Sequence, residues 1–499
     1  MMRLTQYILT MCVAVALGAC SRAKVPAEYA DVNRQPDIYP DYREVTVPVN
    51  MAPLHFELMT PCDEVVTRFS AGSEEIVCAG RKTRPAISDW QRLVATGKNA
   101  VISVEVFARN GSQWQRYKPF RIHVSEDAID PWLSYRLISP SYVSFEELTI
   151  NQRCLEDYTE QTIYNNMLNS TEADGQCINC HSYQRGNPEK MQFHARLKNG
   201  GTMILRDGQL TKMNLKTDST LSAGVYPAWH PTLNLIAYST NTTRQMFHTV
   251  DVDKVEVLDL ASDLILYDVD RQEVSTVEND PLEMEVFPSW SPDGRWLYYC
   301  SAHFEPRDST DASGEMILRY KDLKYNVYRK AFDAKTLTFG PRELVFDAAE
   351  QGKSATLPRV SPDGRWLLLA VGEWGVFHIW HRDADLWLMD LQTGDIQPVR
   401  EINSPDVESY HTWSSDGHWL VFSSRRYDGN YTRPFFAHFD GKGHFTRPFE
   451  LPCDDPDYHR QLLRSYNIPE LMTGRVTVTP QAFAAAFEQT PVQAAFVSR

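Results

Sequence analysis

The chain has 499 residues, and its 65 acidic and 50 basic side chains give a net charge of −15. This acidic balance argues against a nucleic-acid partner, which would require a basic surface. The length is sufficient for two or three domains. Its 12 tryptophans and 23 tyrosines favour a fold rich in β-strands.

The first residues predict an export signal over residues 1–19. Arg3 supplies a basic start, residues 7–16 are apolar, and Leu-Gly-Ala-Cys follows, ending at Cys20. The apolar segment is too short to remain as a membrane-spanning helix, so we expect it to be cleaved. The tetrad resembles the bacterial lipobox, which implies cleavage before Cys20 and lipidation of that cysteine; a plain secretory signal is the alternative. Ser21 resembles the sorting residue of outer-membrane lipoproteins, so we expect a lipid anchor in the outer membrane, facing the periplasm.

A small β domain is expected after a polar tether at residues 20–40. From 41 to 125 the apolar residues alternate, and one hairpin turns at Asn110-Gly111. Short strands at this spacing predict a β-sandwich of the immunoglobulin or fibronectin type. No residue in it indicates catalysis, so we interpret it as a spacer or docking module.

A five-residue run, Cys-Ile-Asn-Cys-His, occupies positions 177–181. C-x-x-C-H is the attachment sequence of a c-type haem, in which two thiols add to the vinyl groups and the histidine ligates the iron. We therefore predict one covalent haem c on Cys177 and Cys180 within residues 174–194, with His181 as the proximal ligand. A redox C-x-x-C, half of a zinc site and a structural disulfide are the alternatives.

Four similar segments follow this motif. Each combines an apolar strand, a turn built on Pro or Asp-Gly and a second apolar strand, and a further strand pair comes after it. Four strands per unit, recurring about every 50 to 70 residues, predict the blades of a β-propeller. The segments are YPAWHPTLNLIAYST from Tyr226, FPSWSPDGRWLYYCSA from Phe287, LPRVSPDGRWLLLAVG from Leu357 and YHTWSSDGHWLVFSSR from Tyr410.

The run W-S-P-D-G-R-W at 290–296 and its copies resemble the WD40-like repeat of the bacterial Tol-system periplasmic propeller protein. The match is close in three copies and weaker at Tyr226, where Thr-Leu-Asn replaces Asp-Gly-Arg. The expected fold is all-β: a propeller of about five to seven blades, six favoured, over 132–475. We expect the segment SYNIPELMTGRVTV to close the ring, and 476–499 to form a C-terminal tail.

Aligning the haem motif with the repeats puts Cys180 and His181 at the W-S-P position, in the turn after an innermost strand. His230 takes the serine place of that turn in the next blade, so it could approach the iron from the opposite side. The other candidates for the sixth position are an open site and the side chains of His194, His248, Met191, Met203 and Met213.

The remaining cysteines suggest one further link. Cys62 and Cys78 flank a loop and form a candidate disulfide in an oxidising compartment. Whether any pair among the others is bridged stays open on the sequence alone; these are Cys154, Cys300 and Cys453.

No motif indicates an enzyme. The recurring Asp-Gly pairs are explained by turn geometry, and HIWHRDAD at 378–385 is interpreted as a solvated loop rather than a metal site. There is no P-loop and no nucleophile elbow. We therefore expect an electron carrier that docks a redox protein. The alternatives are a Tol-like scaffold that binds a protein or a glycan, with haem structural, sensory or absent, and a haem enzyme with an open sixth site.

Overall fold

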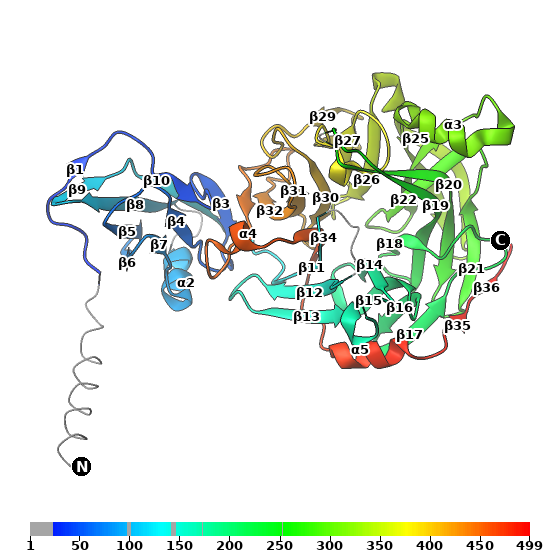
Figure 1. Cartoon of the computed structure of the whole chain (residues 1–499), viewed down its shortest axis with the longest axis horizontal. Coiled ribbons are helices and arrows are strands. Elements are labelled where there is room, and N and C mark those ends of the chain that lie inside the picture. Colours follow the sequence, from blue (N-terminus) through cyan, green and yellow to red (C-terminus); the bar gives the residue numbers. More distant parts are fainter. Residues whose placement is uncertain (1–22, 97–100, 141–145, 172, 252) are drawn as a thin grey trace, which may run out of the picture. The chain divides into compact units, whose positions relative to one another are not determined.

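The computed structural model describes residues 23–96, 101–140, 146–171, 173–251 and 253–499. The chain divides into two compact units: unit 1 is Met1–Glu126 with Pro452–Arg460, and unit 2 is Asp127–Leu451 with Gln461–Arg499 (Figure 1). The predicted signal peptide and the lipidation site Cys20 lie outside the described residues. Within the described ranges, no helix is long and apolar enough to cross a membrane.

Unit 1 contains two β-sheets. The larger has the order β1-β9-β8-β10-β3, with β5 also paired to β8 and to β6, and the smaller has the order β2-β4-β7. The immunoglobulin or fibronectin type of this unit stays a prediction. The strands are β1 (Ala30–Asp31), β2 (Ile38–Tyr39), β3 (Val45–Pro48), β4 (Phe56–Leu58), β5 (Glu64–Ala71), β6 (Glu74–Ala79), β7 (Lys82–Thr83), β8 (Val101–Asn110), β9 (Gln113–Arg116) and β10 (Phe120–Ser125).

A helix that the sequence analysis missed, α2 (Ile87–Thr96), packs on unit 1. Its buried residues Trp90, Leu93 and Val94 recur at three- and four-residue spacing, which is the helical signal that could have revealed it. Trp90 donates a hydrogen bond from its indole nitrogen to the Met51 carbonyl at 3.0 Å. The helix therefore covers the core of unit 1 with one face.

The predicted disulfide between Cys62 and Cys78 is wrong for this structure, because both thiols are free. Cys78 lies on β6 opposite Thr67 of β5. Cys62 lies five residues before Thr67, a separation on the order of 15 Å at the rise of a strand. A disulfide requires Cα atoms within about 7 Å, so the register of the hairpin keeps the two thiols apart.

Unit 2 is a β-propeller, as predicted. Its strands form antiparallel meanders, each beginning with an inner strand at the central axis; β20 and β22 also share one parallel bridge. The meanders, inner strand first, are β34 (Ser465–Met472), β11 (Trp132–Ile138), β12 (Thr149–Cys154), β13 (Glu160–Asn165); β14 (Gln176–Gln184), β15 (Asn187–Leu197), β16 (Gly201–Arg206), β17 (Gln209–Asn214); β18 (Val225–Trp229), β19 (Leu235–Phe247), β20 (Val255–Asp268), β21 (Glu273–Glu278); β22 (Glu283–Trp290), β23 (Trp296–His303), β24 (Asn326–Asp333), β25 (Thr338–Phe346); β26 (Ser354–Val360), β27 (Trp366–Gly372), β28 (Asp385–Asp390), β29 (Ile396–Pro398); and β30 (Glu408–Trp413), β31 (Trp419–Ser424), β32 (Arg433–His438), β33 (Phe449–Glu450).

The C-terminal strand β34 completes the first meander. It pairs antiparallel with β11, from Trp132 opposite Met472 to Ile138 opposite Ser465. This is the ring closure expected from SYNIPELMTGRVTV, and it joins segments more than 300 residues apart. The first and last parts of the propeller are thereby held in one sheet (Figure 1).

The segment predicted as a tail is packed onto the propeller. Helix α5 (Pro480–Phe487) places Phe483 and Phe487 against Tyr164 and Phe193, with ring centroids 5.1 to 6.5 Å apart. Two short strands then add to the outer edges of two propeller sheets. β35 (Val492–Gln493) pairs in parallel with β17, and β36 (Ala495–Phe496) pairs in parallel with β21. The remaining α-helices of the described residues are α3 (Ala312–Leu318) and α4 (Tyr458–Gln461).

The repeated Ser-Pro-Asp-Gly run forms the hairpin turn between an inner strand and the next strand. Ser291 Oγ donates to Asp293 at 2.6 Å and accepts from the Trp296 amide at 3.0 Å, while Gly294 has a φ of 70°. The same side-chain bonds recur in the turns at Ser361 and Ser414. The aspartates are therefore bound within their turns, in agreement with the structural interpretation of these motifs.

Candidate functional site

Each inner strand of the propeller is interrupted by a β-bulge. One extra residue on the inner strand shifts the register by one there, and the first bulge residue adopts a left-handed backbone without being glycine. This conformation costs about 1 kcal/mol or more, so its repetition marks a feature that the ring requires. In the six described inner strands, the first residues of the bulges are Cys180 (φ 57°), Tyr226 (48°), Phe287 (55°), Leu357 (54°), Tyr410 (44°) and Ile468 (51°).

The bulges meet at the axis, where all six first residues line a small cavity of about 40 Å³. The haem motif is thus part of the repeat, but not at the predicted position. Cys180-His181 corresponds to the bulge pair Tyr226-Pro227, in the middle of the inner strand, and not to the W-S-P turn. The reason is that β14 continues to Gln184 and ends in a two-residue turn, which is shorter than the Ser-Pro-Asp-Gly turn.

A wider cavity of about 490 Å³ lies next to the starts of the inner strands. Both motif thiols, Cys177 and Cys180, line it, together with His194, Arg136 and Arg196. His194 reaches this position because it lies opposite Asn179 in the β14–β15 pair. Two residues of the motif and one of the three alternative histidines are therefore brought together.

The lining of the wide cavity carries positive charge and, among the described residues, no carboxylate. Arg196 approaches the Cys177 thiol, with 3.7 Å between Nη2 and Sγ. Arg136 donates to the Ile178 carbonyl at 2.7 Å and to Asn467 Oδ1 at 2.8 Å, which holds it at the cavity wall. The cavity is therefore suited to an anionic ligand.

Burial sets the protonation states around the thiols. It raises the pKa of Cys180, against the opposing effect of Arg196 and Arg136. It lowers the pKa of His194 to about 3, so this imidazole is neutral at physiological pH. His194 Nδ1 lies 3.1 Å from Thr202 Oγ1, a contact that orients the ring. A neutral, oriented imidazole can act as a metal ligand.

His181, the predicted proximal ligand, does not share the wide cavity with the two thiols. It lines the small axial cavity and is not among the residues that line the wide one. Its ring is buried, neither nitrogen has a hydrogen-bond partner of good geometry, and burial lowers its pKa to about 3. A proximal ligand must lie on the same side of the strand as the thioethers, and the described fold does not bring His181 there.

His230, the favoured distal ligand in the sequence analysis, is held in a turn. Its Nδ1 accepts hydrogen bonds from the amides of Thr232 and Leu233 at 3.2 and 3.0 Å. Its Nε2 lies 3.2 Å from the Gly294 carbonyl, and the ring packs on Trp290 at 4.7 Å. His230 therefore replaces the turn serine of the other repeats, and it does not line the cavity with the two thiols, contrary to the expected approach to the iron.

His248 is also outside the wide cavity. It lies in the connection between β19 and β20, and its ring stacks on Tyr320 with centroids 6.1 Å apart. Its amide donates to the Lys254 carbonyl at 2.9 Å. Of the three alternative histidines, only His194 lines the cavity with the thiols.

The wide cavity fits the requirements of a covalent haem in three respects. Two thiols line the same space, a neutral histidine lines it with them, and two arginines can neutralise a pair of carboxylates. The position of His181 does not fit, because it lines the axial cavity instead. The donor set that fits this fold is therefore Cys177, Cys180 and His194.

The segment 378–385 is not a solvated loop, contrary to the sequence interpretation. His378 and His381 are 1% and 0% exposed, because this segment packs under the hairpin of β19 and β20. His381 Nε2 lies 2.9 Å from Glu256 Oε2, and this carboxylate raises the pKa of His381 against the effect of burial. The arrangement is a buried ion pair that holds the segment in place.

A second group of potential metal ligands lies at the start of unit 2. One ligand atom each of Asp127, His418 and His438 falls within 4.8 Å of the others. His438 Nε2 is 2.7 Å from Asp127 Oδ2, which is a hydrogen bond and closer than two ligands of one metal ion approach each other. The group is therefore a hydrogen-bonded cluster in this structure.

No protein-family model and no curated protein matches the chain. Among solved structures, a variant of the Synechocystis apocarotenoid oxygenase is 10% identical, with 86% of this chain and 98% of that chain covered at a TM-score of 0.37. A puromycin-hydrolysing peptidase of Mycobacterium tuberculosis is 13% identical, with 85% and 57% covered, at 0.34. A variant of prolyl oligopeptidase B of Galerina marginata is 8% identical, with 80% and 61% covered, at 0.34.

The chain spans less than two thirds of either peptidase. TM-scores at this level carry no argument about a site or an activity. The assignment of unit 2 as a β-propeller rests on its own strand pairings.

Proposed function

We propose that this protein is a monohaem c-type cytochrome of the cell envelope that exchanges electrons with a protein partner. The proposal includes the predicted lipid anchor on Cys20, which would hold the protein at the membrane facing the periplasm. The observation that carries it is the convergence of both C-x-x-C-H thiols on one cavity of about 490 Å³. Haem c would supply reversible one-electron chemistry in that cavity.

The residues of the cavity have separate roles in this proposal. Cys177 and Cys180 form the thioether links, and His194 supplies a neutral nitrogen whose ring is oriented by Thr202. Arg136 and Arg196 neutralise carboxylates of the cofactor and keep them at the wall. Cys180, which has a left-handed backbone at the bulge, lines the same cavity as Cys177.

The attachment is tested by co-expression with haem-attachment factors, followed by extraction of the denatured chain and a pyridine haemochrome spectrum. We expect the wild-type chain to retain its haem and the Cys177→Ser, Cys180→Ser double variant to lose it. The matched control is Cys154→Ser, which alters another buried cysteine of the propeller outside the cavity and should retain haem. Haem that extracts freely from the wild-type chain would overturn the proposal.

A ligand prediction separates the histidines. His194→Ala is expected to change the visible and magnetic circular dichroism spectra of the iron, because this histidine lines the cavity with the thiols. His230→Ala should leave those spectra unchanged and lower the free energy of unfolding by about 1 kcal/mol, since two turn amides lose their acceptor. An altered iron spectrum only in His181→Ala would show instead that haem attachment rearranges β14.

The second candidate function is a propeller that binds a protein or a glycan, with haem structural, sensory or absent. The observation that favours it is the group of tryptophans Trp229, Trp290 and Trp413 in the lining of one cavity of about 220 Å³, because aromatic side chains are common at binding surfaces. A colourless purified chain that binds a partner through this cavity would favour this function over electron transfer.

A further inference from the structure

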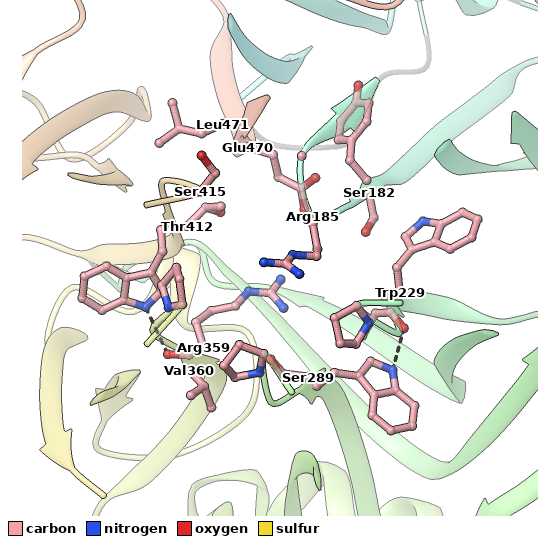
Figure 2. Close-up of a pocket in the computed structure, with 18 of the residues that line it drawn as sticks. Ser182, Arg185, Trp229, Ser289, Arg359, Val360, Thr412, Ser415, Glu470 and Leu471 are labelled. Carbon is pink, nitrogen blue, oxygen red and sulfur yellow. Dashed lines mark hydrogen bonds between the residues drawn. The ribbon is translucent and has the colours of Figure 1, made fainter. Parts of the chain in front are cut away.

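A third cavity, of about 220 Å³, opens on the propeller axis at the other ends of the inner strands. It is lined by the inner-strand residues after the bulges and by the hairpin turns that follow. Figure 2 shows this pocket, which we call the axial mouth. Its charged lining residues are Asp130, Arg185, Arg359 and Glu470.

Two guanidinium groups converge in the axial mouth. Arg359 directly follows the Leu357-Pro358 bulge, and Arg185 begins the two-residue turn between β14 and β15. Figure 2 shows both groups turned into the pocket toward each other. Among the described residues, neither has a hydrogen bond or an ion pair. Burial lowers the pKa of Arg359, because the charged guanidinium is less stable there than in water. A bound anion would stabilise this charge.

The two carboxylates of the axial mouth do not neutralise this pair. Asp130 accepts hydrogen bonds from the Ser415 amide at 2.7 Å and from Ser415 Oγ at 2.6 Å. Burial raises the pKa of Glu470 to about 7 despite the opposing effect of Arg359. A part of the Glu470 population is therefore uncharged at neutral pH, and the mouth keeps a net positive charge.

The walls of the axial mouth are aromatic and apolar. The Trp290 indole donates to the Ala228 carbonyl at 3.1 Å and the Trp413 indole to the Arg359 carbonyl at 3.2 Å, which fixes these walls. A bare inorganic ion would leave them without contacts, whereas an organic anion could use both features. The apolar wall residues include Pro227, Trp229, Pro231, Trp290, Pro292, Pro362 and Trp413.

We propose that the axial mouth binds the carboxylate of an organic ligand, with Arg185 and Arg359 binding the carboxylate and the tryptophan–proline wall contacting an apolar body. The carboxylate can belong to a small acid or to the C-terminus of a polypeptide. This site is separate from the cavity of the thiols and does not depend on haem.

Isothermal titration calorimetry on the full-length protein tests the proposal with four probes. They are 3-phenylpropionate, an N-acetylated tripeptide ending in phenylalanine with a free carboxylate, its C-terminal amide, and inorganic phosphate. We expect at least one free carboxylate to bind, about tenfold or more tighter than the amide and than phosphate. Binding of the tripeptide alone identifies a chain terminus as the source, and binding of phenylpropionate alone identifies a small acid. Equal binding of the amide, tighter binding of phosphate, or no binding by either carboxylate overturns the proposal.

Variants assign the binding to the two arginines. Arg359→Gln and Arg185→Gln are each expected to weaken binding about tenfold, and Glu470→Gln to strengthen it, because one opposing charge is removed. The matched control is Arg365→Gln in the same hairpin as Arg359, which pairs with Asp390 at 2.8 Å outside the mouth and should bind as wild type.

The folding of these variants gives an independent readout. Without ligand, Arg359→Gln should melt at the wild-type temperature or above it, because a partly buried charge without an ion-pair partner is removed. A large loss of thermal stability would show that Arg359 is a structural residue and would overturn its assignment. Arg185→Gln alters an exposed turn residue, so its affinity stays measurable in either case.

Discussion

A chain that ends at Arg464 is expected to lose the cooperative thermal unfolding of the propeller. This truncation removes β34, so β11 loses its inner neighbour over the whole register from Trp132 to Ile138. It also removes the buried side chains Tyr466, Leu471, Met472, Val476, Phe483 and Phe487. At about 1.5 to 3 kcal/mol for each buried side chain, the loss is about 10 kcal/mol or more, which is comparable to the entire stability of a domain.

Differential scanning calorimetry and near-ultraviolet circular dichroism measure this effect. The matched control is a chain that ends at Thr490, which lacks the two-residue edge strands β35 and β36, the small buried side chain of Ala494 and the ion pair of Arg499 with Glu273. Its melting temperature should fall by less than about 4 °C. A peptide of residues 465–499 added to the truncated chain should restore the transition. A truncated chain that melts like the wild type would show that β34 is not needed for ring closure.

The Glu285→Gln variant is expected to be more stable than the wild type at pH 8.5 and to show no gain near pH 4.5. Glu285 is buried on β22, and neither carboxylate oxygen has a hydrogen-bond partner. Burial, assisted by Glu278 and Asp263, raises the pKa of Glu285 to about 8 from an ordinary value of 4.5. Between these two values the folded state binds more protons than the unfolded state, so the free energy of unfolding falls as the pH rises.

This destabilisation by the charged carboxylate is complete above about pH 8 and corresponds to about 5 kcal/mol, which the substitution by glutamine would remove. Urea unfolding of the wild type and the variant at several pH values between 4.5 and 8.5 measures it. If the free energies of unfolding of the two proteins changed in parallel with pH, the raised pKa of Glu285 would be contradicted.

The matched control is Glu408→Gln on β30, because Glu408 also lies two residues before a bulge but is fully bonded. Its Oε1 accepts from Ser404, Ser424 and Arg426 at 2.7, 2.8 and 3.0 Å. Burial also raises the pKa of Glu408, but Arg426, Ser404 and Ser424 oppose this effect. Glu408→Gln should therefore destabilise the protein at pH 8.5, by about 2 kcal/mol, because these bonds are weakened.

Local sequence determined the strands and turns of the propeller. The Ser-Pro-Asp-Gly turn closes with hydrogen bonds between residues at most five apart, such as Ser291 to Trp296. Such contacts are encoded by neighbours along the chain, so the repeat and its fold class could be predicted. The spacing of the buried residues in α2 is a helical signal, but the helix was not predicted because its segment is short and lies between strands.

The position of the haem motif within its blade could not be determined in this way. The bulge at Cys180 recurs in the other inner strands, but the short turn after Gln184 shifts the end of β14 relative to theirs. Because side chains alternate across a strand, such a shift changes which side of the strand each residue faces. The assignments of His181 and His230 changed for this reason.

The sequence by itself therefore determined the thiol motif, the repeat and the β-propeller class, since these depend on residues close together in the chain. Only the tertiary structure decided which side chains share a cavity. Arg185 and Arg359 meet at the axis, as do Cys180 and Tyr410, although each pair is separated by more than 170 residues. Their proximity depends on ring closure by β34 and on the bulges, and no local pattern encodes a contact between different blades.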